Sequence, residues 1–437
     1  MSNVSPTRPI LKPAFAGAVL AVLTAPAWAV DLSTSDGTWT FSIDGSVNVD
    51  YIYSNCESPT SAVPITGGTG GLTCVGSANG DGVSNIGNGL LPAAFTFGVA
   101  TTQDGIDMSA HLGLYPGIAT NDGGSPNIQA GTANGSSNTA LGSTGLDIRQ
   151  VYMTFGTKTA GTFTLGRNIG LFGADVILND MTLLGVGAPG SAATASPSNT
   201  TLGGIGFGYI YTDWLAQIDY TTPDLSGFAF TVGIFDPLNS LSDAGSVEAK
   251  KAPGFHAKLT YTLPIAEGTK LYLSAAFLTQ QQDYVAAATT LAPTGTPYSY
   301  TGNGIDFFAK FDMQDLEVIG YYYHASGLGS TALFDGGDFG LGQTRTSDGF
   351  LAQATYKFGP VKVGVNYGRS TLDYANAADQ LANPDLLDYN QKITGGVYYS
   401  LTKNLMLLGE ISGVKSQNQA GGSNSATTFN LGAFLGF

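Results

Sequence analysis

Charged residues are scarce in this sequence. Asp, Glu, Lys and Arg make up 11% of its 437 residues, whereas about 25% is usual for a soluble globular protein. Basic residues are the scarcer kind, because 17 Lys and Arg stand against 32 Asp and Glu. A nucleic-acid-binding protein needs a basic face, so this balance argues against nucleic acid as a partner. Something other than water must cover much of the exterior.

Long apolar runs are almost absent as well. The one sustained run, Ala14–Ala25, follows two basic residues and precedes the small residues around Trp28. It is shorter than the roughly 20 residues that a membrane-spanning helix needs, and this order of features is typical of a secretory signal peptide. We expect residues 1–29 to be removed and residues 30–437 to form one domain. Any membrane crossing must then be made by strands.

What the sequence does contain is a two-residue alternation, which is clearest from Trp39 to Tyr53. Odd positions there are mostly apolar or aromatic, and even positions are mostly polar. A period of two is typical of a β-strand with one apolar and one polar face. Aromatic residues lie at both ends of the apolar row, as expected where a membrane strand meets the two headgroup layers. This segment therefore predicts a transmembrane strand.

Segments of this kind recur along the whole chain. The sixteen predicted strands are 39–53, 93–102, 106–114, 146–156, 162–168, 209–220, 227–235, 254–263, 270–280, 304–313, 316–326, 349–358, 361–367, 391–401, 405–412 and 427–437. Long and short connections alternate between them. The pattern predicts an all-β fold, a closed antiparallel transmembrane β-barrel with long extracellular loops and short periplasmic turns. At sixteen strands, the interior should hold an aqueous channel.

Several short phrases, taken in order, resemble a known family. They are Ile43–Val47, Arg149–Tyr152 before Gly161–Arg167, Tyr220–Pro223 before Gly227–Phe228, and the terminal Phe437. Together they resemble the general trimeric porins of Gram-negative outer membranes. The resemblance implies an outer-membrane homotrimer with one pore in each subunit. It also implies that the third long connection, residues 169–207, folds inward to narrow the pore.

Strand parity places most of the titratable side chains on the water-facing side of the wall. The inward acids are Asp44, Asp50, Asp107, Asp213, Asp219 and Asp306, and the inward groups that can be basic are His111, His256, Lys258, Lys310 and Lys362. In a narrow passage, an excess of one sign biases which ions enter. We expect a passive diffusion channel for small hydrophilic solutes and ions that favours cations or neutral solutes.

The resemblance also indicates which residues form the constriction. Asp175 and Asp180 lie in the third connection, and Arg149 and Arg167 match the positions of the arginines that face loop carboxylates in family members. In regular strands, however, both arginines share the parity of apolar neighbours, so they would point outward. A bulge can re-aim a side chain. Pore lining therefore stays open beside contact with lipopolysaccharide phosphate or a neighbouring subunit.

Cysteine is nearly absent, since Cys56 and Cys74 are the only two. Both lie in the first long connection, which the topology places outside the cell. An oxidising route and an even count favour a disulfide, and a two-cysteine metal site would lack the further ligands that zinc needs.

Three alternatives to passive diffusion remain. A substrate-specific channel would have a binding constriction, and an adhesin would use the long outer loops. A barrel enzyme would need a nucleophile and a base brought together, but the three histidines, His111, His256 and His324, fall in separate strands without a supporting motif. We expect no enzymatic activity and no cofactor, and we expect outer-membrane lipid and lipopolysaccharide as surroundings.

Overall fold

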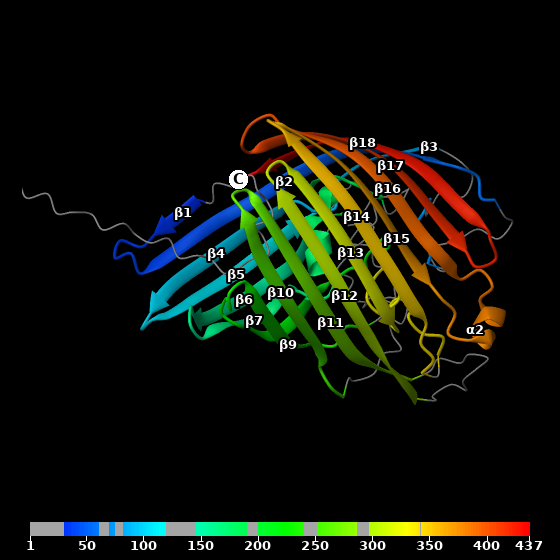
Figure 1. The fold of residues 1–437 in the computed structure, drawn as a ribbon, viewed down its shortest axis with the longest axis horizontal. Coiled ribbons are helices and arrows are strands. Elements are labelled where there is room, and N and C mark those ends of the chain that lie inside the picture. Colours follow the sequence, from blue (N-terminus) through cyan, green and yellow to red (C-terminus); the bar gives the residue numbers. More distant parts are fainter. Residues whose placement is uncertain are drawn as a thin grey trace, which may run out of the picture.

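The computed structural model describes residues 30–60, 70–74, 82–118, 146–189, 200–239, 251–285, 297–340 and 342–437. The expected signal peptide, residues 1–29, lies outside the described residues. The described strands form one 18-stranded sheet (Figure 1).

The strands follow one another along the chain with few helices between them. They are β1 (Val30–Ser33), β2 (Trp39–Cys56), β3 (Gly82–Gly87), β4 (Ala94–Gln103), β5 (Ile106–Pro116), β6 (Leu146–Thr157), β7 (Gly161–Ile169), β8 (Trp214–Thr221), β9 (Phe228–Phe235), β10 (Gly254–Ala266), β11 (Thr269–Val285), β12 (Pro297–Met313), β13 (Leu316–Ser326), β14 (Thr346–Phe358), β15 (Val361–Leu372), β16 (Leu387–Ser400), β17 (Leu405–Asn418) and β18 (Ser423–Gly436). The helices are α1 (Ala174–Asn179), the 3-10 helix η2 (Met181–Leu184) and α2 (Ala377–Ala382).

The sheet closes on itself into a barrel. Each strand from β4 to β18 pairs antiparallel with the next, and β18 then pairs with β2. The backbones of Gly45 and Phe437 exchange two hydrogen bonds of 2.8 and 2.9 Å where the ends meet. A closed sheet leaves no unpaired edge. The expected sixteen-stranded barrel is therefore confirmed, with β2 and β4–β18 as its wall.

The two remaining strands are short additions to β2. Strand β1 pairs with residues 40–43 of β2, beyond the end of β18. Strand β3 pairs with residues 50–55 of β2, and β4 pairs with residues 39–46. Strands β3 and β4 thus make one crossing between them, and the residues that join them leave the wall.

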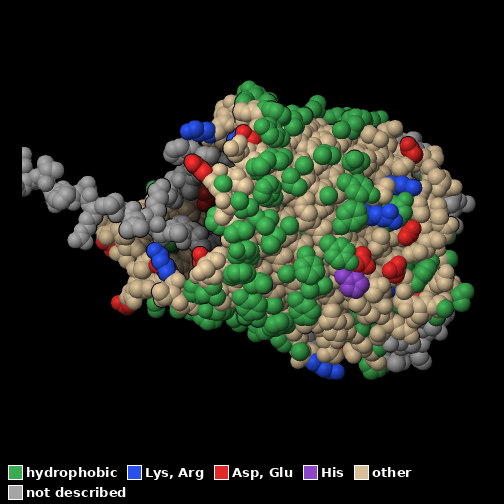
Figure 2. Space-filling model, viewed as in Figure 1, with side chains coloured by type: hydrophobic (Ala, Val, Ile, Leu, Met, Phe, Trp, Pro, Cys, Tyr) green, Lys and Arg blue, Asp and Glu red, His purple; other side chains and the backbone are tan. Residues whose placement is uncertain are grey.

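The exterior shows the alternation that the sequence predicted. In β2, Tyr51 is 48% exposed, whereas its neighbour Asp50 is 0% exposed. Figure 2 shows a band of apolar side chains running across the strands, with charged side chains mainly on the two sides of the band. A band of this kind suits the hydrocarbon layer of a bilayer. Among the described residues, no helix is long and apolar enough to cross a membrane.

Several strand ends differ from the expectation. Strand β11 ends at Val285 rather than at residue 280, and β12 begins at Pro297 rather than at residue 304. Strand β8 begins at Trp214 rather than at residue 209, because Tyr211 instead donates its backbone N–H to the carbonyl of Thr331 in another loop. Strands β17 and β18 extend further than the alternation indicated, and four residues, 419–422, connect them. The last outer connection is therefore a long hairpin with a tight turn.

Candidate pore constriction

The third loop, of which residues 170–189 and 200–213 are described, turns into the barrel between β7 and β8. Its apolar residues pack on inward positions of β11–β14, so the barrel contains an internal core. That core joins Phe172, Val176 and Tyr209 of the loop to Leu278, Phe308, Tyr321 and Tyr323 of the wall, among others. These inward wall positions are apolar because they bury loop side chains rather than face water. The inward fold of the third loop is what the family resemblance implied.

One end of the loop is held by Asp175 in α1. Its carboxylate lies 2.6 Å from Lys258 Nζ on β10, and it accepts hydrogen bonds from the hydroxyls of Tyr272 and Ser274 on β11. Burial opposes ionisation of this carboxyl, but Lys258 and the two hydroxyls outweigh it and hold the pKa of Asp175 below its ordinary value. The backbone N–H of Gly173 donates to Asp306 on β12, at 2.6 Å. Asp175 therefore fastens the loop to the wall.

Asp180 holds the middle of the loop, between α1 and η2. One carboxylate oxygen accepts from the backbone N–H of Thr182 at 2.9 Å and from the side-chain amide of Asn366 on β15 at 3.0 Å. The other accepts from the hydroxyl of Tyr209 at 2.9 Å. Burial and this neighbouring carboxylate raise the pKa of Tyr209 well above its ordinary value. Asp180 is itself 3% exposed, so its partners are protein groups.

Glu410 on β17 holds the far side of the loop. Its Oε2 accepts the backbone N–H groups of Val186 and Gly187, each at 2.9 Å, and its other oxygen accepts from the hydroxyl of Tyr398 at 2.6 Å. The residues that join β3 to β4 also meet the loop here, since Leu90 donates its N–H to the carbonyl of Gly185 at 2.7 Å. The loop thus reaches from β7 past β10–β15 to β17 and β3–β4.

The two arginines lie near the base of the loop and point differently. The pairing of β5 with β6 shifts by one residue between Gly113 and Leu114, which leaves Arg149 as the extra residue of a bulge. Arg149 is consequently 5% exposed and bonds Asp147 at 3.2 Å. Arg167 lies opposite residues 151 and 216, which are exposed, so it keeps the outward parity.

Asp213 ends the loop close to both arginines. Its backbone is in the left-handed region, with φ at 59°, and its carboxylate accepts the backbone N–H of Trp214 at 2.6 Å. Burial raises the pKa of Asp213 to about 6, although this N–H and the charges of Arg167 and Arg149 oppose the rise. The structure thus brings Arg149, Arg167 and Asp213 together, and it holds Asp175 and Asp180 elsewhere along the loop.

Charged side chains take inward positions on several strands. Lysines point inward from β10–β12, and each has an acid beside it: Lys258 has Asp175, Lys310 lies 2.6 Å from Glu317, and Lys270 lies 3.3 Å from Asp312. On the opposite side of the ring, Asp44 on β2 and Asp107 on β5 take inward positions.

Sequence reasoning missed several charged groups of the inner wall, among them Glu410 and Lys392 near the third loop. Glu410 shares the inward parity of Leu408 and Ser412, so the alternation of β17 could have placed it inside. Lys392 on β16 is 0% exposed, and the carboxylates of Asp180 and Glu410 lie close enough to attract its ammonium group. Nothing in the alternation shows that such groups hold a loop, because the contacts come from residues more than two hundred positions away.

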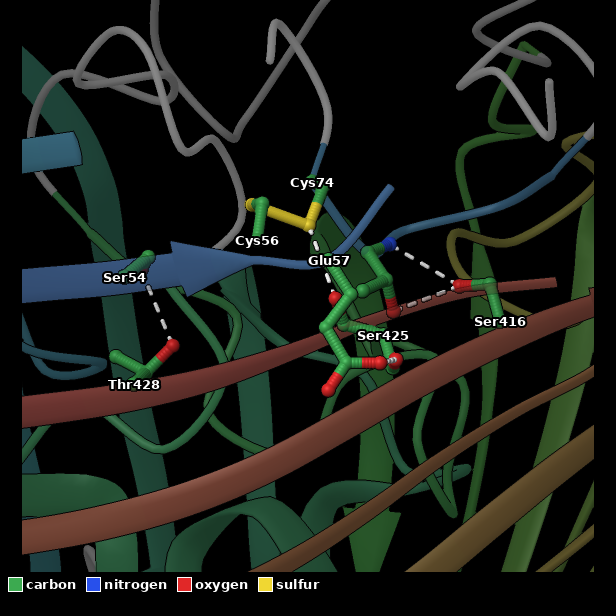
Figure 3. Close-up of a disulfide and its surroundings, with 8 residues drawn as sticks. Ser54, Cys56, Glu57, Cys74, Ser416, Ser425 and Thr428 are labelled. Atoms are coloured by element: carbon green, nitrogen blue, oxygen red, sulfur yellow. Dashed lines mark hydrogen bonds between the residues drawn. A yellow bond between two sulfur atoms is a disulfide. The ribbon is translucent and has the colours of Figure 1, made fainter. Parts of the chain in front are cut away.

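The two cysteines lie close together, whereas the three histidines lie apart from one another. Cys56 and Cys74 form the expected disulfide, with their Cα atoms 5.8 Å apart (Figure 3). His111 stacks on Tyr152, His256 stacks on Phe235, and His324 faces outward beside Asp348. Among the residues that the structure describes, no group of three or more His, Cys, Asp or Glu side chains could hold a metal ion.

Comparisons with solved structures find the same architecture. The outer-membrane channel DcaP of Acinetobacter baumannii superposes with a TM-score of 0.63 at 16% identity, covering 93% of this chain and 99% of that one. The trimer form of OmpT from Vibrio cholerae gives 0.50 at 12%, covering 92% and 100%. OmpF of Salmonella typhi in complex with daunomycin gives 0.53 at 12%, covering 92% and 99%. At these identities the matches show a shared fold.

Comparisons of sequence give the family. No curated protein matches this chain significantly. Residues 16–419, however, match the profile of the family described as Gram-negative porin, and that range covers most of the chain. The closed sixteen-stranded barrel and the inward third loop agree with this match. The chain therefore belongs to the Gram-negative porin family.

Proposed function

We propose that this outer-membrane porin, which is a channel and not an enzyme, passes small hydrophilic solutes and ions by passive diffusion and favours cations or neutral solutes. One observation carries the preference. The lysines that point inward from β10–β12 are each paired with an acid, so their charge is locally neutralised. The inward acids of β2 and β5 lie on the opposite side of the ring, where that stretch of wall supplies no lysine.

The cation preference follows from the way in which low-dielectric walls focus the electric field of the inward charges along the passage. A water-filled passage with an excess of acids lowers the energy of an entering cation and raises that of an anion. Asp44 and Asp107 are the acids best placed for this, because Asp44 is partly exposed and Asp107 is exposed. The loop-base residues Arg149 and Asp213 add a local field, and we propose that they adjust selectivity at the constriction. Arg167 keeps the outward parity, and we propose that it contacts lipopolysaccharide phosphate or a neighbouring subunit instead.

Liposome swelling with solutes of matched size tests the preference. Glucosamine, glucose and gluconate have similar dimensions but carry positive, zero and negative charge. We expect glucosamine and glucose to enter faster than gluconate. A faster entry of gluconate would contradict the proposal, and saturable entry of one solute would indicate a substrate-specific channel instead.

A pair of variants assigns the effect to the lumen. Replacing Asp44 and Asp107 by Asn removes two inward acids and should narrow the difference between glucosamine and gluconate. Glu267→Gln serves as the matched control, because Glu267 is exposed in the turn between β10 and β11. It should leave the ranking of the solutes unchanged.

We also propose that the mature protein begins at residue 30 and assembles as a homotrimer in contact with outer-membrane lipid and lipopolysaccharide. The trimer is supported by the family and by a neighbour whose structure is a trimer form. Chemical cross-linking of the purified protein, followed by electrophoresis, should give a ladder that ends at three subunits. A ladder that ends at one subunit would contradict the trimer.

A further inference from the structure

We infer that the Cys56–Cys74 disulfide seats a turn of the first loop inside the mouth of the barrel, where the turn holds the third loop in place and so helps to set the width of the pore. The turn comprises Gly70–Cys74, and all its residues are described. The inference goes beyond the channel function of the family, because it assigns a positioning role to an outer loop.

The turn lies within the barrel mouth because its partners are inward wall residues. Ser416 on β17 accepts the backbone N–H groups of Leu72 and Thr73 at 3.1 and 3.0 Å. Asn390 on β16 donates to the carbonyl of Gly70 at 3.0 Å. Both wall residues are 0% exposed. Figure 3 shows Ser416 and the disulfide on the two sides of this turn.

Leu72 carries the contact between the turn and the third loop. It packs in a small cluster with Ala188, Leu202 and Phe207, which all belong to the third loop. A Cβ atom added to Gly206 would lie 2.4 Å from Leu72 Cδ1, so the side chain of Leu72 lies close against the backbone of the third loop at this point. The turn is therefore in direct apolar contact with the third loop through the side chain of Leu72.

The opposite side of this loop segment rests on the wall. Gly208 donates its backbone N–H to the hydroxyl of Ser370 on β15 at 2.9 Å. A Cβ atom on Gly368 would lie 2.0 Å from the carbonyl oxygen of Phe207. The segment is thus held between β15 on one side and Leu72 on the other. Without the turn, one of these two supports is lost.

The disulfide fixes where the turn lies. Cys56 is the last residue of β2, which is part of the closed wall, and Cys74 follows Leu72 and Thr73 directly. Cys74 has φ at 58°, a conformation that non-glycine residues adopt rarely and that surrounding structure must maintain. A cross-link over 18 positions also removes conformational freedom that the turn would otherwise keep. Leu72 is in this way tied to the wall from two directions.

Single-channel recording in a planar bilayer tests the inference. The double variant C56S/C74S should show a unit conductance about 1.5-fold higher than that of the wild type, with more frequent transitions between levels, since conductance follows the narrowest open cross-section. Leu72→Ala keeps the disulfide and should change conductance in the same direction. Thr60→Ala is the matched control, because Thr60 belongs to the same loop but bonds Ser423 on β18, and no hydrogen bond joins it to the third loop among the described residues.

Reduction of the inserted wild-type channel keeps the test independent of folding. Tris(2-carboxyethyl)phosphine donates two electrons to the disulfide and becomes the phosphine oxide, while water supplies its oxygen and the two thiol protons. Adding it to the extracellular side should raise conductance to the level of the double variant. Unchanged conductance in the reduced channel and in Leu72→Ala would overturn the inference. If the disulfide-free protein then dissociated at a lower temperature, the bridge would stabilise the protein without setting the width of the pore.

Discussion

Replacing Lys258 by Met should loosen the third loop without altering the barrel wall. Lys258 and Asp175 are each 15% exposed at the side chain and 2.6 Å apart. Removing one partner of a buried ion pair costs about 3–5 kcal/mol, because the other charge stays buried without compensation. Tyr272 and Ser274 still donate to Asp175, so we take the lower end, about 3 kcal/mol. Since each 1.4 kcal/mol is tenfold, the undocked population of the loop should rise roughly 100-fold.

Single-channel noise measures this population, because an undocked loop changes the current through its own pore. Lys258→Met should increase the frequency of brief current transitions, and Lys251→Met should not, since Lys251 is 76% exposed and lies 3.9 Å from its acid. Combining Lys258→Met with Asp175→Asn removes the buried charge and should restore a quiet channel. A quiet single variant, or a double variant as noisy as the single one, would refute the role assigned to the pair.

Acidity provides a further check on the same pair. Lys258 and the hydroxyls lower the pKa of Asp175 in the folded protein, so the stability that this group contributes is present at neutral pH and is lost only as pH falls through the lowered pKa. In Lys258→Met the pKa of Asp175 should instead rise. Protonation then removes the uncompensated charge, and the variant should become quieter as the pH falls toward 5.

Three other predictions address the constriction and the closure of the barrel. Burial raises the pKa of Asp213 to about 6, so acidification from pH 7.5 to 5 should protonate its carboxylate. The loss of this negative charge should weaken the cation preference, measured as the reversal potential in a salt gradient. In Asp213→Asn the reversal potential should depend less on pH. Glu410→Ala leaves two loop N–H groups without their acceptor, at a cost of about 1–3 kcal/mol each. This variant should therefore show more current noise than the wild type. Glu317→Gln is the control, because it leaves these N–H groups bonded, and its noise should be lower than that of Glu410→Ala. Gly45→Ala places a Cβ atom 2.6 Å from the carbonyl of Ala94, so electrophoresis after heating should show a lower denaturation temperature, and an unchanged temperature would argue against tight closure there.

Strand alternation sufficed to predict the wall of this protein, because water and lipid act on each side chain separately. The period of two gave the sixteen crossings, their order and the inward position of Asp306. It failed at Arg149, because a single extra residue in β6 reverses the parity of the strand beyond it. The bulge results from pairing with β5, and no pattern within β6 alone indicates it.

The interior was harder to predict than the wall. Inward apolar residues such as Phe308 and Tyr323 broke the polar rule of a water-filled lumen, because they bury the third loop. The role of Asp180 depends on Asn366, 186 positions away, and that of Glu410 on backbone N–H groups of the loop. Such contacts are set by how the loop crosses the barrel, which a local period does not record. The disulfide was predictable because the chain offers one pairing only.

The reversal potential of the purified wild-type channel in a tenfold gradient of KCl tests the account most directly. The proposed excess of inward acids over inward lysines along the passage predicts that potassium crosses faster than chloride, so the more dilute side should become positive. A potential of the opposite sign would mean that inward bases, rather than acids, control the passage, and it would contradict the charge assignment made for this channel.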